Sequence, residues 1–261
     1  MKEAVKERNV AGSILNSAKA FFRLKAREPE TGKATEGESH AEAVRDWRDW
    51  PWYLSPDKEG TREIIEDLGR AKDELIKKHG SSFVSFVMLG SRAKGYAAKS
   101  SDIDIRAIIV RNKLASSAEW AGIRTDVESA ISNSLRDKSL RVEIGDVFSV
   151  RRMTEFVPEK GLFKEEYCIA RLFAGIHFGD ERTLFGARKE VIKAICRPPP
   201  EPELVWREVE HEFHSIIFGH LDDDKYEMRV SQKLRNDLKE LKLPSLAEMR
   251  KEFGVEENEE A

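Results

Sequence analysis

The sequence lacks several features that mark whole classes of protein. It has two cysteines in 261 residues, Cys168 and Cys196, and their separation fits neither a close disulfide pair nor a metal-binding spacing. We therefore expect free thiols and a reducing, cytoplasmic location. No apolar run approaches the 18 or more residues that a membrane span needs. The start MKEAVKERNV lacks the apolar stretch that is typical of a secretory signal. These absences predict a soluble protein that does not bind a membrane.

A strong charge of either sign is also missing. The 45 Lys and Arg residues against 48 Asp and Glu residues give a formal net charge of −3. A long nucleic acid is normally bound by a basic surface, so the composition provides no general attraction for RNA or DNA. The basic residues that do stand close together suit a triphosphate better than a polymer: Arg92, Lys94, Lys99 and Arg106.

The pattern of apolar residues predicts an α+β fold, with a small mixed β-sheet and flanking helices. Residues 83–89 are almost continuously apolar and predict a buried strand, followed by strands at 102–110 and 140–150. A helix is expected at 61–79, and another between the capping residue Ser116 and about Leu135.

From about residue 154 onward the pattern is helical, and no further strand is expected. A short last helix should begin after Ser245, which Glu248 can complete as a capping box. The longer helices of this half are expected at 163–175, 181–195, 202–218 and 224–243.

Composition divides the chain into four parts. Residues 1–57 are expected to hold a terminal helix, a flexible linker and an aromatic segment. Residues 58–153 should form the domain that carries the sheet, and residues 154–253 a helical C-terminal domain. An acidic tail at 254–261 completes the chain.

The most informative segment is LGSRAKGYAAKSSDIDI, residues 89–105. It predicts the end of a strand, a Gly-Ser turn, a basic loop and a second strand. Because strand residues alternate between faces, Asp102 and Asp104 should point the same way, roughly 6.5–7 Å apart. Two carboxylates on one face suit a hard cation, and Mg²⁺ is usually held by one or two carboxylates and by substrate phosphates.

This segment resembles the signature of the nucleotidyltransferase superfamily, which includes DNA polymerase beta: Gly90-Ser91, ten residues, then Asp-Ile-Asp. It is most similar to the minimal and the aminoglycoside-type members, and the likeness covers roughly residues 83–148. The resemblance implies that 58–153 is the catalytic domain. It also implies transfer of a nucleoside monophosphate, AMP from ATP or from another nucleoside triphosphate, to a hydroxyl, with release of pyrophosphate.

The same resemblance implies roles for single residues. Asp102 and Asp104 would bind two Mg²⁺ ions and act as catalytic residues. Gly90 would let the backbone approach the phosphates, and Ser91 would offer its hydroxyl and N–H to them. Arg92 is a further candidate for nucleotide binding, with a solvated surface position as the alternative.

Two metal ions need a third carboxylate, and the superfamily supplies it from a neighbouring strand. Glu143, between Val142 and Ile144, fits the apolar–acidic–apolar pattern, and we expect it to be a metal ligand, a general base or both. Asp146 is the rival. Three residues apart on a strand, the two face opposite sides unless Gly145 marks a bulge, so one of them should lie outside the site.

The acceptor is not determined by the motif. A nearly neutral chain and a helical C-terminal half favour a small molecule or a protein over a nucleic acid. The alternative function is a non-catalytic or antitoxin-like protein that has the nucleotidyltransferase fold and binds a nucleotide or a protein partner.

Overall fold

The structure is a computed structural model. All the residues that it describes fall within one compact unit, residues 44–261. The expectations for 1–57, for Ser116 and for 256–261 lie outside the described residues, and the division at residue 153 stays a prediction. The described residues are 60–111, 117–157, 162–163, 166–197, 201–219 and 230–255.

A mixed five-stranded sheet forms the centre of these residues and confirms the predicted α+β fold. The strand order is β3–β2–β1–β7, and β4 also pairs with β2. β1 runs antiparallel to β2 and β7, whereas β2 runs parallel to β3 and β4. The strands are β1 (Phe83–Leu89), β2 (Ile103–Val110), β3 (Val142–Ile144), β4 (Val147–Ser149) and β7 (Ile176–Gly179).

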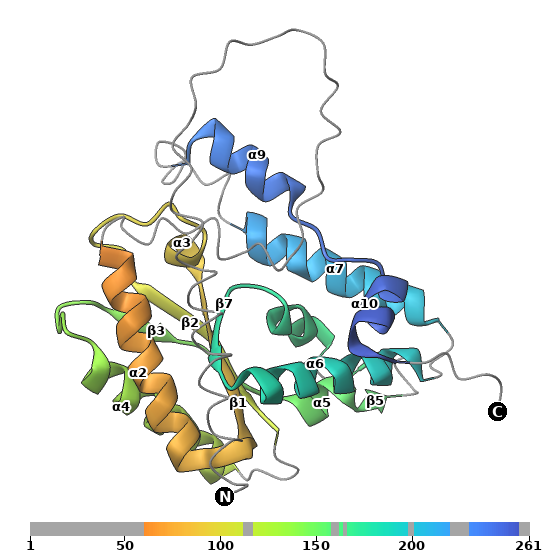
Figure 1. The fold of residues 1–261 in the computed structure, drawn as a ribbon, viewed down its shortest axis with the longest axis horizontal. Coiled ribbons are helices and arrows are strands. Elements are labelled where there is room, and N and C mark those ends of the chain that lie inside the picture. The colour runs from red at the N-terminus through yellow and green to blue at the C-terminus, as the bar shows by residue number, and fades with distance from the viewer. Residues whose placement is uncertain are drawn as a thin grey trace, which may run out of the picture. The chain divides into compact units, whose positions relative to one another are not determined.

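Helices cover both faces of the sheet (Figure 1). On one face α2 (Thr61–His79) and α4 (Ser117–Ser134) pack together over strand residues that include Phe86. On the other face strand residues that include Val87 belong to a second apolar cluster, which the C-terminal helices complete. The sheet therefore separates two apolar cores.

The helix expected at 61–79 is observed as α2 because its apolar residues recur at helical spacing. Ile64, Leu68 and Leu75 are buried on one side of it. The helix ends at Gly80, whose φ of 57° lies in the region that favours glycine.

The strand expected at 140–150 is two shorter strands. Pairing with β2 is interrupted at Gly145 and Asp146 and resumes in the same register, because Ile144 pairs with Ile105 and Val147 with Ile108. A Cβ at Gly145 would lie only 3.0 Å from the carbonyl oxygen of Arg106. The pairing of the third strand region with β2 thus keeps one register on both sides of the interruption. The chain enters α5 (Val150–Thr154) directly after β4.

The expectation that no strand follows residue 154 is wrong, because β7 pairs with β1 at the edge of the main sheet. A strand of four residues has too little periodicity to be seen in the sequence, and its partner lies about ninety residues earlier. The prediction of a helix at 163–175 is also wrong. This region holds β6 (Leu162–Phe163), which pairs with β5 (Phe156–Val157), and a 3₁₀ helix, η5 (Glu166–Leu172).

The helices expected at 181–195 and 202–218 and after Ser245 agree with the structure, whereas α9 covers only Gln232–Glu240 of the helix expected at 224–243, and Leu241–Leu243 are not helical. The side chain of Asp180 accepts a hydrogen bond from the N–H of Thr183 at the start of α6, and Ser245 and Glu248 form the predicted capping box. Both cysteines are free, and within the described ranges no helix combines the length and apolar character that crossing a membrane requires. The helices are α6 (Glu181–Cys196), α7 (Pro202–Phe218), α9 (Gln232–Glu240) and α10 (Leu246–Phe253).

Candidate metal centre

Three carboxylates come together at one end of the paired strands β2 and β3. Asp104 and Glu143 are direct partners in the parallel register, and Asp102 immediately precedes β2. One oxygen of each side chain lies within 4.8 Å of the others, and all three side chains are half-buried. Ile103 and Ile105 pack into the core under α2 and α4, so alternation directs the two aspartates to the face that carries the C-terminal helices. Three oxygen ligands at this spacing on strands can hold a metal ion.

Asp146 lies outside this cluster. It is exposed and lines a different cavity, together with Trp120 and Arg124 of α4. Ile144 and Val147 both pack against the core under α2 and α4, so the alternation of faces is broken at Gly145 and Asp146. Asp146 also lies in the two-residue interval between β3 and β4, away from the Asp104–Glu143 pair. Of the two candidates for the third carboxylate, the structure therefore brings Glu143 to the aspartates.

The electrostatics of the cluster favour a cation. Burial raises the pKa of the Asp104 carboxyl, and the negative charges of Asp102 and Glu143 raise it further. Arg106 and Lys94 oppose this by lowering it. A bound cation would relieve both the mutual repulsion and the cost of burying the charge.

Arg106 already contributes positive charge there. Its guanidinium forms an ion pair with Oδ1 of Asp104 at 3.0 Å and another with Oε1 of Glu143. The sequence placed this arginine near the motif but did not identify it as part of the site. The signal was present, because a residue two positions after Asp104 on a strand shares its face.

The Gly-Ser turn lies against the carboxylates. Gly90 begins the short helix α3 (Gly90–Ala93) with a φ of 69°, and a Cβ added to it would lie 1.8 Å from Oδ2 of Asp104. Only glycine fits at this position, because any side chain would displace the carboxylate. The backbone of the turn is therefore in contact with the site, and Ser91 beside it is half-buried.

The side chain of Arg92 is directed elsewhere. It is 1% exposed, and its guanidinium donates hydrogen bonds to the carbonyl oxygens of Lys99, Ser101 and Asp102. The alternative of a solvated surface position is thus wrong. Contact with a nucleotide phosphate stays a prediction, and one that this placement does not favour, because Arg92 holds the loop that leads into Asp102.

Lys94 is one of the basic residues beside the motif, and no pattern in the sequence indicated that it would be buried. Its side chain is 3% exposed, and its Nζ donates to the carbonyl oxygen of Gly219, at the end of α7, at 3.0 Å. Burial lowers the pKa of Lys94 to about 8, and the charge of Asp104 opposes this shift. The contact joins residues 125 positions apart, so no local pattern could have revealed it.

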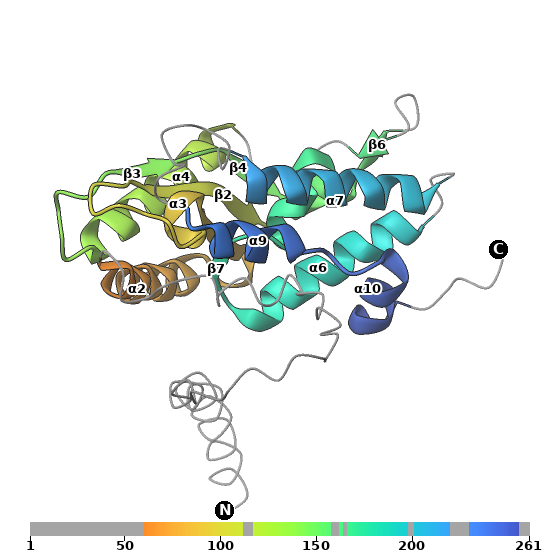
Figure 2. The ribbon, with the colours of Figure 1, turned by 90° about the horizontal axis from the view of Figure 1, so that it is seen from above.

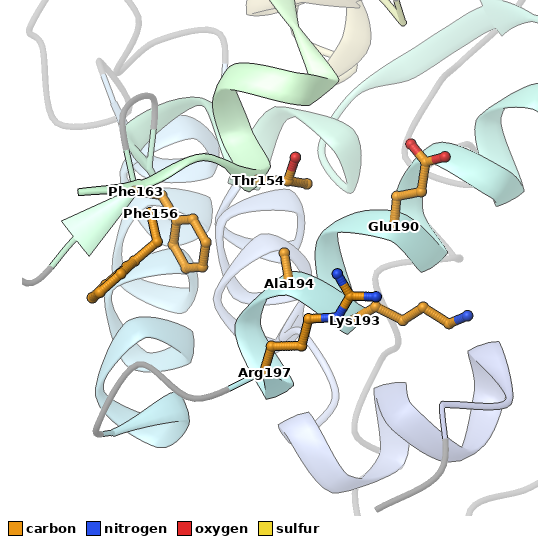
Figure 3. A pocket seen from close by; sticks show the side chains of 7 residues that line it. All are labelled: Thr154, Phe156, Phe163, Glu190, Lys193, Ala194 and Arg197. Carbon is orange, nitrogen blue, oxygen red and sulfur yellow. The ribbon is translucent and has the colours of Figure 1, made fainter. Parts of the chain in front are cut away.

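A separate pocket lies beyond the opposite end of β2 (Figure 3). Arg111, which follows this strand, forms an ion pair with Glu190 in its lining. Arg111 lies seven positions after Asp104, about 23 Å along a strand. This pocket therefore does not belong to the carboxylate cluster. The other residues that line it are Thr154, Phe156, Phe163, Lys193, Ala194 and Arg197.

The chain's own geometry thus provides a mixed α/β fold with an acidic cluster on neighbouring strands. Comparison with known proteins adds no assignment to this geometry. No family model matches the sequence, and neither a curated protein nor a solved structure matches the chain.

Proposed function

We propose that the protein is a Mg²⁺-dependent nucleotidyltransferase, which transfers a nucleoside monophosphate to a hydroxyl group. The transfer that we favour is that of AMP from ATP. One observation carries the proposal. The oxygens of Asp102, Asp104 and Glu143 lie within 4.8 Å of one another, and Gly90 of the Gly-Ser turn packs directly against Asp104. The carboxylate cluster and the Gly-Ser turn thus share one site. The resemblance of this motif to the nucleotidyltransferase superfamily agrees with it.

The residues have distinct roles in this reaction. Asp102 and Asp104 would hold two Mg²⁺ ions, and Glu143 would hold the ion on the acceptor side. When bound, the ions neutralise the triphosphate and lower the pKa of the acceptor hydroxyl. Ser91 offers its hydroxyl and backbone N–H to the terminal phosphates, while Gly90 leaves the space in which the backbone can approach them.

The transfer is a displacement at the α-phosphorus. The acceptor oxygen forms a bond to this phosphorus as the bond to the leaving pyrophosphate breaks. The acceptor proton passes to Glu143 or through it to solvent. The products are the nucleoside monophosphate ester of the acceptor and pyrophosphate, so no oxidant or further reactant is needed.

The acceptor that we favour is a small molecule or a protein side chain. The net charge of −3 provides no general attraction for a nucleic acid. The face of the sheet that carries the carboxylates is also the face that the C-terminal helices cover, so these helices are the natural boundary of the acceptor site.

The test is transfer of label from α-³²P-labelled ATP, GTP, CTP and UTP with Mg²⁺ to a whole-cell lysate, followed by separation into protein, RNA and small molecules. We expect wild type to label one fraction. The variant Asp102→Ala/Asp104→Ala should lose at least about 10³-fold in rate, because the charge stabilisation of the transition state is removed. Asp146→Asn is the matched control, since this carboxylate lies outside the cluster, and it should retain the activity.

Two outcomes would count against the proposal. Equal loss in Asp146→Asn and in Glu143→Gln would overturn the assignment of the third carboxylate. No labelled product in any fraction, while a nucleotide still binds, would replace the enzyme with the non-catalytic, partner-binding alternative.

A further inference from the structure

Arg106 is placed so that it competes with any metal ion for the carboxylates. Its guanidinium pairs with one oxygen of Asp104 and one oxygen of Glu143 at the same time. These residues supply two of the three ligands of the candidate metal centre. A metal ion that took both of these oxygens would have to break both ion pairs.

The strand itself directs Arg106 to this position. In the pairing of β1 with β2, Val87 is opposite Ala107 and Met88 is opposite Ile105, so Arg106 is left without a partner in β1. Such a bulge adds one residue to a strand and re-aims its side chain, and bulges are over-represented beside active sites. Alternation from Asp104 places Arg106 on the side of the carboxylates, and after the bulge Ala107 and Ile108 continue into the two cores.

We propose that Arg106 is an internal counter-cation, which holds the carboxylate cluster in the metal-free protein and must be displaced when a divalent cation binds. Arg106 thereby sets the affinity for the metal. This inference rests on the proposed function, because it concerns the same carboxylates.

Displacement is sterically simple. The Arg106 side chain is 45% exposed, so it can turn into solvent without disturbing the core. Mg²⁺ requires near-octahedral oxygen ligands at 2.0–2.1 Å, and a guanidinium pairing with the same carboxylates prevents this arrangement. A dication would also repel the guanidinium that remained beside it, so both effects act in the same direction.

The opposite role would predict the opposite result. If Arg106 only held Asp104 and Glu143 in position, its removal would loosen the site and weaken metal binding. If it competes, its removal strengthens binding. The direction of the change therefore separates the two interpretations without any knowledge of the acceptor.

The experiment is titration of the full chain with Mn²⁺, followed by electron paramagnetic resonance of the free ion. We expect Arg106→Gln to bind Mn²⁺ about 3- to 10-fold more tightly than wild type, the range that two exposed ion pairs supply. Arg106→Lys should fall between them, because an ammonium cannot bridge two carboxylates as a planar guanidinium does. Asp104→Asn should lose the binding.

The matched control is Arg141→Gln. Arg141 lies one residue before β3 and is exposed, and its backbone carbonyl accepts a hydrogen bond from the N–H of Ile103. The variant removes the same charge from a position two residues before Glu143. We expect its Mn²⁺ affinity to stay within about twofold of wild type, because charges in water interact weakly at this exposure.

A second measurement uses wild type and does not depend on any variant folding. Phenylglyoxal modifies free guanidinium groups, and mass spectrometry reports its attachment to Arg106. Mg²⁺ should increase this modification, because it frees the side chain. Unchanged or reduced modification, or weaker Mn²⁺ binding by Arg106→Gln, would overturn the inference.

Failure of this inference is distinguishable from failure of the proposed function. Tighter Mn²⁺ binding by Arg106→Gln without any transfer of label would support the counter-cation and contradict the enzyme. If neither wild type nor Arg106→Gln bound Mn²⁺, both would be overturned.

Discussion

Arg92 is almost completely buried. Arginine is rarely buried in a protein unless its charged group has partners. Its Nε donates to the carbonyl oxygens of Ser101 and Asp102 at 3.1 and 3.2 Å, and its Nη2 donates to that of Lys99 at 3.3 Å. These bonds determine the path of the loop into β2. Arg92 therefore positions Asp102 through the backbone. This role requires no contact between the guanidinium and the carboxylate.

At this scale we predict that Arg92→Met lowers the free energy of unfolding by about 2–4 kcal/mol, because three carbonyl oxygens lose the charged donor that holds the loop. Urea denaturation measures the change. Arg207→Met, at an exposed position of α7, is the control and should stay within about 0.5 kcal/mol of wild type. A variant of full stability that had lost only nucleotide binding would show instead that Arg92 contacts phosphate.

At the scale of secondary structure, β7 is the element that completes the sheet. Gly179 pairs with Ser85 of β1, and a Cβ added to Gly179 would lie 2.0 Å from the carbonyl oxygen of Val84. The close approach of the two backbones at this point requires a glycine. In contrast, Gly69 lies within α2 with no atom inside 4 Å of an added Cβ.

These two glycines should respond oppositely to the same substitution. We expect Gly179→Ala to lower the free energy of unfolding by about 1–3 kcal/mol, because backbone must move to admit the methyl group. Gly69→Ala should raise it by about 0.5–1 kcal/mol, because alanine loses less conformational entropy in a helix. Thermal or urea unfolding of both variants is the measurement. Equal effects of the two substitutions would contradict the pairing of β7 with β1 at Gly179.

At the scale of the whole molecule, Lys94 connects the turn beside the carboxylates to the C-terminal helices. Its Nζ lies 3.0 Å from the carbonyl oxygen of Gly219, the residue that follows α7. Figure 2 shows this end of α7 beside α3. An ammonium is favourable at the C-terminal end of a helix, because the helix dipole is negative there. Burial nevertheless lowers the pKa of Lys94 from its ordinary value of 10.5 to about 8.

This pKa shift predicts a pH dependence of stability. Between pH 8 and about 10.5 the unfolded chain binds a proton at Lys94 that the folded chain has lost, so the contribution of Lys94 to stability rises with pH through this window. Below about pH 8 both states are protonated and the contribution is constant. The difference in unfolding free energy between wild type and Lys94→Met should therefore grow in favour of wild type from pH 8 to pH 10. A difference that is flat over this range would contradict the buried ammonium, and Lys193→Met at an exposed position is the control.

Sequence patterns predicted the parts of the fold that depend on neighbours in the chain. The helix α2 and the capping box at Ser245 follow from residues within a few positions of each other. β7 was missed because a strand of four residues, of which only Phe178 is buried, carries little periodicity. Its strand conformation depends on β1, which no local pattern reports.

The candidate site divides in the same way. The sequence by itself determined that Asp102 and Asp104 share a face and that a glycine turn precedes them, because alternation along a strand and the conformational freedom of glycine are local properties. Only the tertiary structure decided that Glu143, and not Asp146, joins them, because the choice depends on the register in which Asp104 pairs with Glu143. Register is set by contacts between segments that are far apart in the chain. For the same reason only the fold revealed that Lys94 is buried against the end of α7.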